Sequence, residues 1–113
     1  MASDPLMKVQ LEGAEAVFML GAEDNTETVE NVDVEVFLED GSRWSATFLS
    51  LAEIGRLMSG WKTTGECLGG SYLQCADLVI VGREGVDAMT EVLRGLLESG
   101  QLRNVLMRVN IEE

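Results

Sequence analysis

Hydrophobic and polar residues alternate along several short segments of the chain, which is typical of half-buried β-strands. The clearest is segment 31–39, in which apolar side chains fall on the even-numbered positions from Val32 to Leu38. Segments 7–11, 43–49 and 105–111 alternate in a similar way, and segment 16–20 is a short apolar run. We predict a strand over each of these five segments.

The turn between segments 31–39 and 43–49 decides which side chains share a face of the sheet. A two-residue turn at Asp40-Gly41 would place Val36 opposite Ser45, so that a row of valines would face a polar row. We therefore predict a three-residue loop, Glu39-Asp40-Gly41, with Gly41 in the left-handed conformation. The opposed residues are then Val36 and Trp44, Val34 and Ala46, and Val32 and Phe48, while Asp33, Glu35 and Phe37 share the outer face.

Two segments have helical periodicity. Residues 50–64 begin with the capping-box spacing of Ser50 and Glu53 and stop at Gly65, and residues 86–98 stop before Gly100. Gly55 and Gly60 each cost the first helix about 1 kcal/mol relative to alanine, so we expect tertiary packing to stabilise it and a neighbouring backbone to approach closely there.

The segments between and after the helices complete the predicted fold. Residues 72–75 and 78–81 are predicted as a strand pair, with the apolar segment 78–81 as a central strand covered on both faces. The chain is then a single α+β domain over residues 1–113, with a mainly antiparallel sheet and two helices packed on one face. Residues 1–6 are expected to be disordered or introduced by cloning.

The composition excludes several chemistries. The chain has no histidine, which removes a Ser-His-Asp triad, a Cys-His pair and any histidine metal site. Segment 23–27 lacks the glycine and the spacing of an EF-hand, and the glycine-rich segment 65–70 follows a helix rather than preceding one, unlike a phosphate-binding loop. Cys67 and Cys75 match no redox or zinc motif and are expected to be free thiols. We predict a non-enzymatic protein with no catalytic residue, cofactor or metal.

The charge is unevenly distributed. Of the 20 acidic residues, 11 lie in the first 40 positions with Lys8 as the only base, so this segment carries −10 of the net charge of −12. Such a block is either a solvated face that maintains solubility or a surface that meets a basic partner, whereas direct contact with nucleic acid is disfavoured. Phe37 is the one large apolar residue predicted on the acidic outer face, where it would form a binding hot spot with a charged rim. The candidate partner-binding residues are Glu23, Asp24, Glu27, Glu30, Asp33, Glu35, Phe37 and Glu39.

The segment from Trp44 to Val81, with the motif WxxTGECLGGxY from Trp61 to Tyr72, resembles a stretch found in small uncharacterised bacterial proteins. In size and charge the whole chain is similar to the immunity proteins of bacterial toxin systems. That resemblance implies a small cytoplasmic α+β domain that blocks a basic nuclease toxin, and it assigns no functional residue.

The leading hypothesis is an acidic, cytoplasmic binding protein that neutralises a basic protein partner, most plausibly an immunity protein against a toxin. A DNA-mimic inhibitor of a nucleic-acid-binding protein, such as a phage antagonist, shares the same physics and is the first alternative. The second is a small-molecule-binding domain with a pocket between helix 50–64 and the sheet. No segment has the length of a membrane span or the pattern of a signal peptide, and an unpaired edge strand could support a homodimer.

Overall fold

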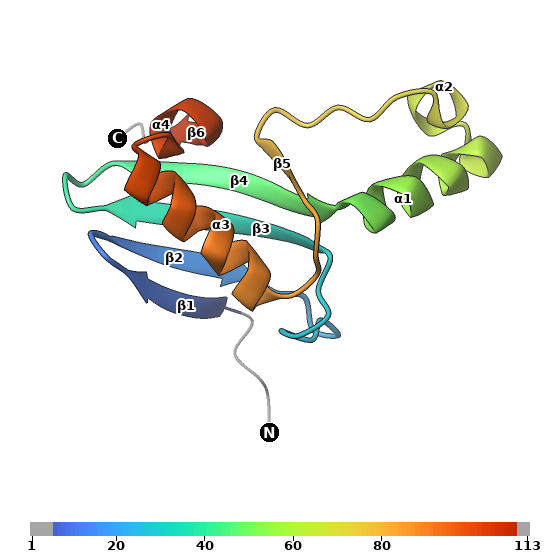
Figure 1. The fold of residues 1–113 in the computed structure, drawn as a ribbon. Helices are drawn as coiled ribbons and strands as arrows, with labels where there is room; N and C mark the ends of the chain where they lie inside the picture. Colours follow the sequence, from blue (N-terminus) through green and yellow to red (C-terminus); the bar gives the residue numbers. More distant parts are fainter. Residues whose placement is uncertain (1–5, 111–113) are drawn as a thin grey trace.

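A six-stranded sheet is the framework of the computed structural model, which describes residues 6–110 (Figure 1). Four strands form an antiparallel meander, and the fourth also pairs with two short strands, one parallel and one antiparallel. The fold is therefore α+β with a mainly antiparallel sheet. The strands are β1 (Leu6–Leu11), β2 (Ala14–Met19), β3 (Asn31–Leu38), β4 (Arg43–Ser50), β5 (Leu78–Val81) and β6 (Met107–Val109).

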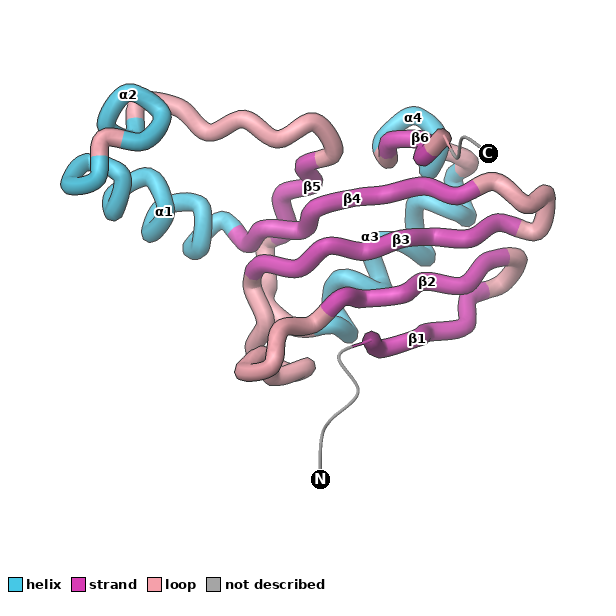
Figure 2. The backbone as a smooth tube through the Cα atoms, turned by 180° about the vertical axis from the view of Figure 1, so that it is seen from behind, coloured by secondary structure: helices cyan, strands magenta, loops and turns pink. Residues whose placement is uncertain are grey.

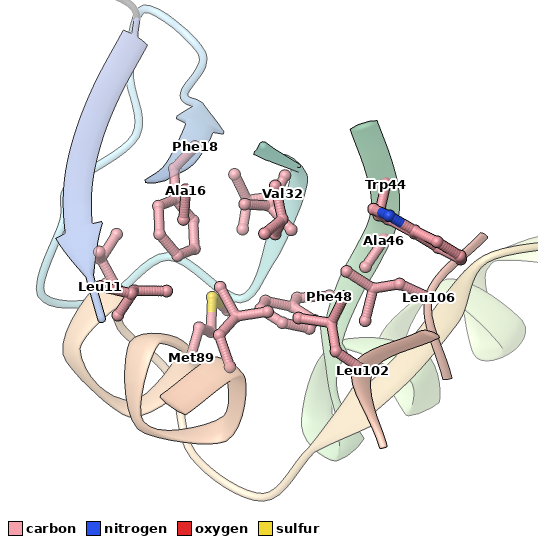
Figure 3. Close-up of a cluster of buried hydrophobic side chains, with 14 of the residues drawn as sticks. Leu11, Ala16, Phe18, Val32, Trp44, Ala46, Phe48, Met89, Leu102 and Leu106 are labelled. Carbon is pink, nitrogen blue, oxygen red and sulfur yellow. The ribbon is translucent and has the colours of Figure 1, made fainter. Parts of the chain in front are cut away.

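One face of the sheet is covered by helix α3 (Val86–Ser99), with the short helix α4 (Leu102–Val105) at its end (Figure 1). The valines of β3 lie on this face with Phe48, and Met89 and Leu93 of α3 are fully buried against them (Figure 3). Close packing of these side chains forms a single hydrophobic core.

Helix α1 (Leu51–Thr64) does not pack on the sheet, so the prediction of two helices on one face is not confirmed. It projects away from the sheet (Figures 1 and 2), and none of its residues is buried. Its predicted caps do form, because Ser50 accepts a hydrogen bond from the Glu53 backbone N–H at 3.0 Å and Gly65 is left-handed. These local signals fix where the helix begins and ends, but they do not determine where it packs.

A turn labelled α2 (Glu66–Gly70) folds back on α1, and we call residues 51–75 the helical arm. The expected close approach at Gly55 and Gly60 is wrong, since no atom lies within 4 Å of a Cβ placed on either residue. The close approach is at Gly70, where such an atom would be 2.0 Å from the Met58 carbonyl oxygen. Gly70 therefore allows α2 to pack against α1.

Three predicted strands differ from the structure. Residues 72–75 form no strand, and the return from the arm leads into β5. β5 pairs with β4 in parallel and is not covered on both faces, since Ile80 is 56% exposed. Segment 105–111 instead contains the end of α4 and the three residues of β6, because the Leu102 and Leu106 side chains pack into the core from this turn.

The expectation of disorder over residues 1–6 can be compared with the structure only at Leu6, which begins β1. Residues 1–5 and 111–113 lie outside the described residues. Among residues 6–110, no helix combines the length and the hydropathy needed to span a bilayer.

The β3–β4 loop is confirmed. Gly41 has φ +88°, and the register places Val36 opposite Trp44 and Val32 opposite Phe48. Within the loop, the Asp40 carboxylate accepts hydrogen bonds from the Ser42 side chain and backbone and from Arg103. These bonds, those from Ser42 first, lower the pKa of Asp40 to about 2.

A matched pair of methionine substitutions tests the position of the core. Met89 is fully buried under the sheet, whereas Met19 is 39% exposed on its other face. We expect Met89→Ala to lower the free energy of unfolding by about 2–5 kcal/mol through the cavity it leaves. Met19→Ala should cost less than about 1 kcal/mol in the same urea titration. Equal losses would contradict this assignment of the core.

The Asp40 carboxyl provides a pH test. Because its pKa is lower in the folded state, Asp40 stabilises the fold above its ordinary pKa of 3.8, and this stabilisation is lost as the pH falls towards about 2. Ser42→Ala should raise the pKa of Asp40 towards 3.8, measured by NMR titration of the carboxyl carbon. An unchanged pKa of Asp40 in this variant would show that the Ser42 hydroxyl is not what lowers it.

Candidate functional site

The face of the sheet opposite α3 carries no helix among residues 6–110, and we call it the open face (Figure 2). Because side chains alternate along a strand, burying the valines of β3 places Asp33, Glu35 and Phe37 on this face. The register aligns each of them with residues of the neighbouring strands. The three rows are Gln10, Glu15, Phe37 and Arg43; Lys8, Val17, Glu35 and Ser45; and Leu6, Met19, Asp33 and Thr47.

An apolar patch lies at the centre of the open face. Phe37 is 37% exposed, Met19 and Leu6 are similarly exposed, and Val17 beneath them is buried. Together they form a shallow hollow of about 280 Å³, small for a site that encloses a ligand. The hollow is lined by Leu6, Lys8, Glu15, Val17, Met19, Glu35 and Phe37.

Basic side chains accompany the acids on this face, which the linear charge block did not indicate. The Arg43 guanidinium carbon lies 5.9 Å from the centre of the Phe37 ring, and its Nε is 3.5 Å from a Glu35 carboxylate oxygen. The hairpin register predicted from the sequence already indicates this basic residue, because it places Arg43 opposite Phe37. The rim of the patch is therefore mixed in charge rather than uniformly acidic.

The acids before β3 lie in the loop that connects it to β2. Glu23, Asp24 and Glu27 are exposed, and no lysine or arginine of the described chain forms an ion pair with them. Asp24 accepts a hydrogen bond from the Gly21 backbone N–H at 2.7 Å, which orders the turn. This loop carries the least compensated negative charge of the candidate residues.

Glu30 makes contacts within the chain at the base of α1. Its carboxylate accepts a hydrogen bond from the Ser50 hydroxyl at 2.7 Å and pairs with Arg56 of α1. The bond from Ser50 first, and then Arg56, lower the pKa of Glu30. Glu30 thus holds the base of the helical arm.

Glu39 lies near Phe37 but far from the candidates at the other end of β3. It is in the β3–β4 loop, and the strand between Glu30 and Glu39 spans about 30 Å at the usual rise per residue. The candidate residues therefore form three groups: Asp33, Glu35 and Phe37 on the open face, Glu23, Asp24 and Glu27 in the loop with Glu30 at the arm, and Glu39 at the opposite end.

A polar cluster joins β5 to β4 beside the apolar patch. The Asp77 carboxylate accepts hydrogen bonds from the Ser45 and Thr47 hydroxyls at 2.8 and 2.9 Å and from the Cys75 thiol at 3.3 Å. Burial alone would raise the pKa of Asp77, but the three bonds outweigh it and lower the pKa. Through these hydrogen bonds, the Asp77 carboxylate stabilises the start of β5.

A shallow polar hollow of about 230 Å³ lies between Glu53 at the base of α1 and the start of β3 with the loop before it. A cavity of about 360 Å³ lies where the turns of the sheet meet the end of α3. It is lined by Gly13, Leu38, Glu39, Asp40, Leu96, Leu97, Gly100, Leu102 and Arg103. Both cysteines are free, and within residues 6–110 no three acidic or cysteine side chains gather as metal ligands would.

Comparison with known proteins finds no relative of this chain. No family model matches it, and neither a curated protein nor a solved structure is similar to it. The candidate function therefore rests on the geometry of the open face and its neighbouring loop.

Proposed function

We propose that the protein is a non-enzymatic binding protein that recognises a basic protein partner through its open face, as an immunity protein recognises a toxin. The observation that carries the proposal is the exposed Phe37 on a helix-free face, with carboxylates on its own strand and in the loop that precedes this strand. An aromatic anchor within a polar rim is the usual composition of a protein-binding hot spot.

The two kinds of residue have separate functions in this proposal. Glu23, Asp24 and Glu27 are exposed and form no ion pair within the described residues, so their field, together with that of Asp33 and Glu35, accelerates encounter with a positively charged surface. Phe37 and Met19 supply apolar area that a partner can cover after encounter. Arg43 lies beside Phe37 at the edge of the patch, where its guanidinium can donate hydrogen bonds to a carbonyl or carboxylate of the partner.

The arrangement of charges supports a protein partner's binding site over a DNA mimic. A mimic presents carboxylates at a regular spacing that imitates phosphates, whereas Lys8 and Arg43 interrupt the acids of the open face. Arg56 and Arg103 similarly pair with Glu30 and Asp40. Glu15 and Glu35 thus lie next to an aromatic residue, and the acids of the open face do not form a continuous row.

Charge reversal on the open face tests the encounter step. The partner captured from the cells that produce the protein is immobilised, and association is measured by surface plasmon resonance at low and high salt. Asp33→Lys with Glu35→Lys should slow association about tenfold at low salt, and the difference should shrink as salt screens the charges. Both acids have neighbours, Thr47 and Arg43, so circular dichroism checks that the variant is folded.

A matched control separates local charge from net charge. Glu91→Lys with Glu98→Lys changes the net charge by the same amount at two exposed positions of α3, away from the open face and from the β2–β3 loop. This variant should associate at nearly the wild-type rate. If both double variants slow association equally, or if association does not depend on salt, the open face is not the site of encounter.

Phe37→Ala tests the anchor. We expect it to raise the dissociation rate, weaken binding by about 2 kcal/mol or more and leave association nearly unchanged. Val105→Ala, at an equally exposed apolar residue in α4, is the control and should leave both rates unchanged. Binding that is unaffected by Phe37→Ala would place the interface elsewhere.

A further inference from the structure

We propose that the helical arm, residues 51–75, is a self-association surface through which two copies of the chain form a twofold dimer with antiparallel arms. The proposal concerns a surface separate from the open face and is independent of the proposed function.

The arm leaves much apolar surface without cover. All 14 residues of α1 are at least partly exposed, although Ile54, Leu57 and Trp61 follow a helical apolar stripe. Leu68 is 79% exposed and Leu51 67% exposed, more than any other large apolar residue in the described chain. A soluble helix with an apolar stripe normally buries it against another element, and the sheet does not provide one here.

The turn at the tip of the arm holds Leu68 in a strained backbone. Cys67 and Leu68 have φ of +50° and +54°, and they are the only two residues other than glycine with positive φ among residues 6–110. This conformation is unfavourable for a residue with a Cβ. Gly70 packs on the Met58 carbonyl and keeps the turn in place, and Leu68 is exposed in this turn.

The charge of the arm favours a second copy as its partner. The arm contains two acids, Glu53 and Glu66, and two bases, Arg56 and Lys62, so the whole net charge of −12 lies on the rest of the chain. Contact between arms is therefore free of the repulsion that contact between two acidic regions would cause.

The two ends of the arm are also complementary to each other. Glu53 lies in the first turn of α1 and Lys62 in the last, so an antiparallel pair brings each Glu53 to the end that carries the other copy's Lys62. The helix dipoles are then opposed as well. Leu51 begins α1, which is about 21 Å long, and Leu68 lies in the turn after its far end, so an antiparallel pair brings each exposed leucine towards the other leucine of the second copy. This self-complementarity is what a twofold interface requires.

Sedimentation equilibrium from about 1 to about 100 µM tests the dimer. We expect the wild type to dimerise in this range and Leu51→Ser or Leu68→Ser to weaken dimerisation at least about tenfold. Both leucines are so exposed that the variants should fold normally. Val105→Ser, at an exposed position outside the arm, should dimerise as the wild type does. A wild type that is monomeric throughout, or arm variants that dimerise unchanged, would overturn the proposal.

Cross-linking tests the antiparallel orientation in a background of Cys67→Ser and Cys75→Ser. Copies with Leu51→Cys are mixed with copies carrying Leu68→Cys and oxidised with glutathione disulfide. The mixture should yield disulfide-linked dimers, whereas either variant alone should not, because like positions lie about 20 Å apart in an antiparallel pair. Efficient cross-linking of Leu51→Cys copies to one another would overturn the antiparallel arrangement.

Discussion

The alignment of the apolar rows of β3 and β4 is the constraint on which the rest of the structure depends. Val32, Val34, Val36 and Phe48 are almost completely buried on the face that α3 covers. Burying each of them contributes about 1.5–3 kcal/mol. A register slip of one residue would expose the whole row and would cost an amount comparable with the total stability of a domain, about 5–15 kcal/mol. The left-handed Gly41 provides the loop geometry that this alignment needs.

The same alternation determines the open face. Since the even-numbered residues of β3 are buried, Asp33, Glu35 and Phe37 must face the opposite direction, across from Thr47, Ser45 and Arg43. The core and the candidate surface are therefore two consequences of one pairing. This explains why an aromatic residue is exposed beside carboxylates without any strain in the strand that carries it.

Features set by neighbouring residues could be predicted from the sequence. The hairpin register followed from the pattern and from Gly41, and the ends of α1 followed from Ser50 and Gly65. The direction of α1 could not be predicted, because a helical stripe does not specify which element covers it. The apolar segment 78–81 likewise fits an edge strand as well as a central one. In the candidate site, the outward position of Phe37 and the place of Arg43 opposite it followed from the hairpin register. The pairing of Glu30 with Arg56 and of Asp40 with Arg103 could not be predicted, because these residues are distant in sequence.

Folding thus divides a linear block of negative charge into parts with different functions. Glu30 and Asp40 are neutralised by arginines and hold the arm and the β3–β4 loop, whereas Glu23, Asp24 and Glu27 remain available to solvent. The arm carries no net charge and presents leucines. In the proposed contacts, association of a basic partner with the acidic loop and open face would be governed by long-range electrostatics, which salt screens. The proposed association of two arms would be governed by apolar burial, which salt does not weaken. The two proposed contacts are compatible, because neither would bring the acidic regions of two copies against each other.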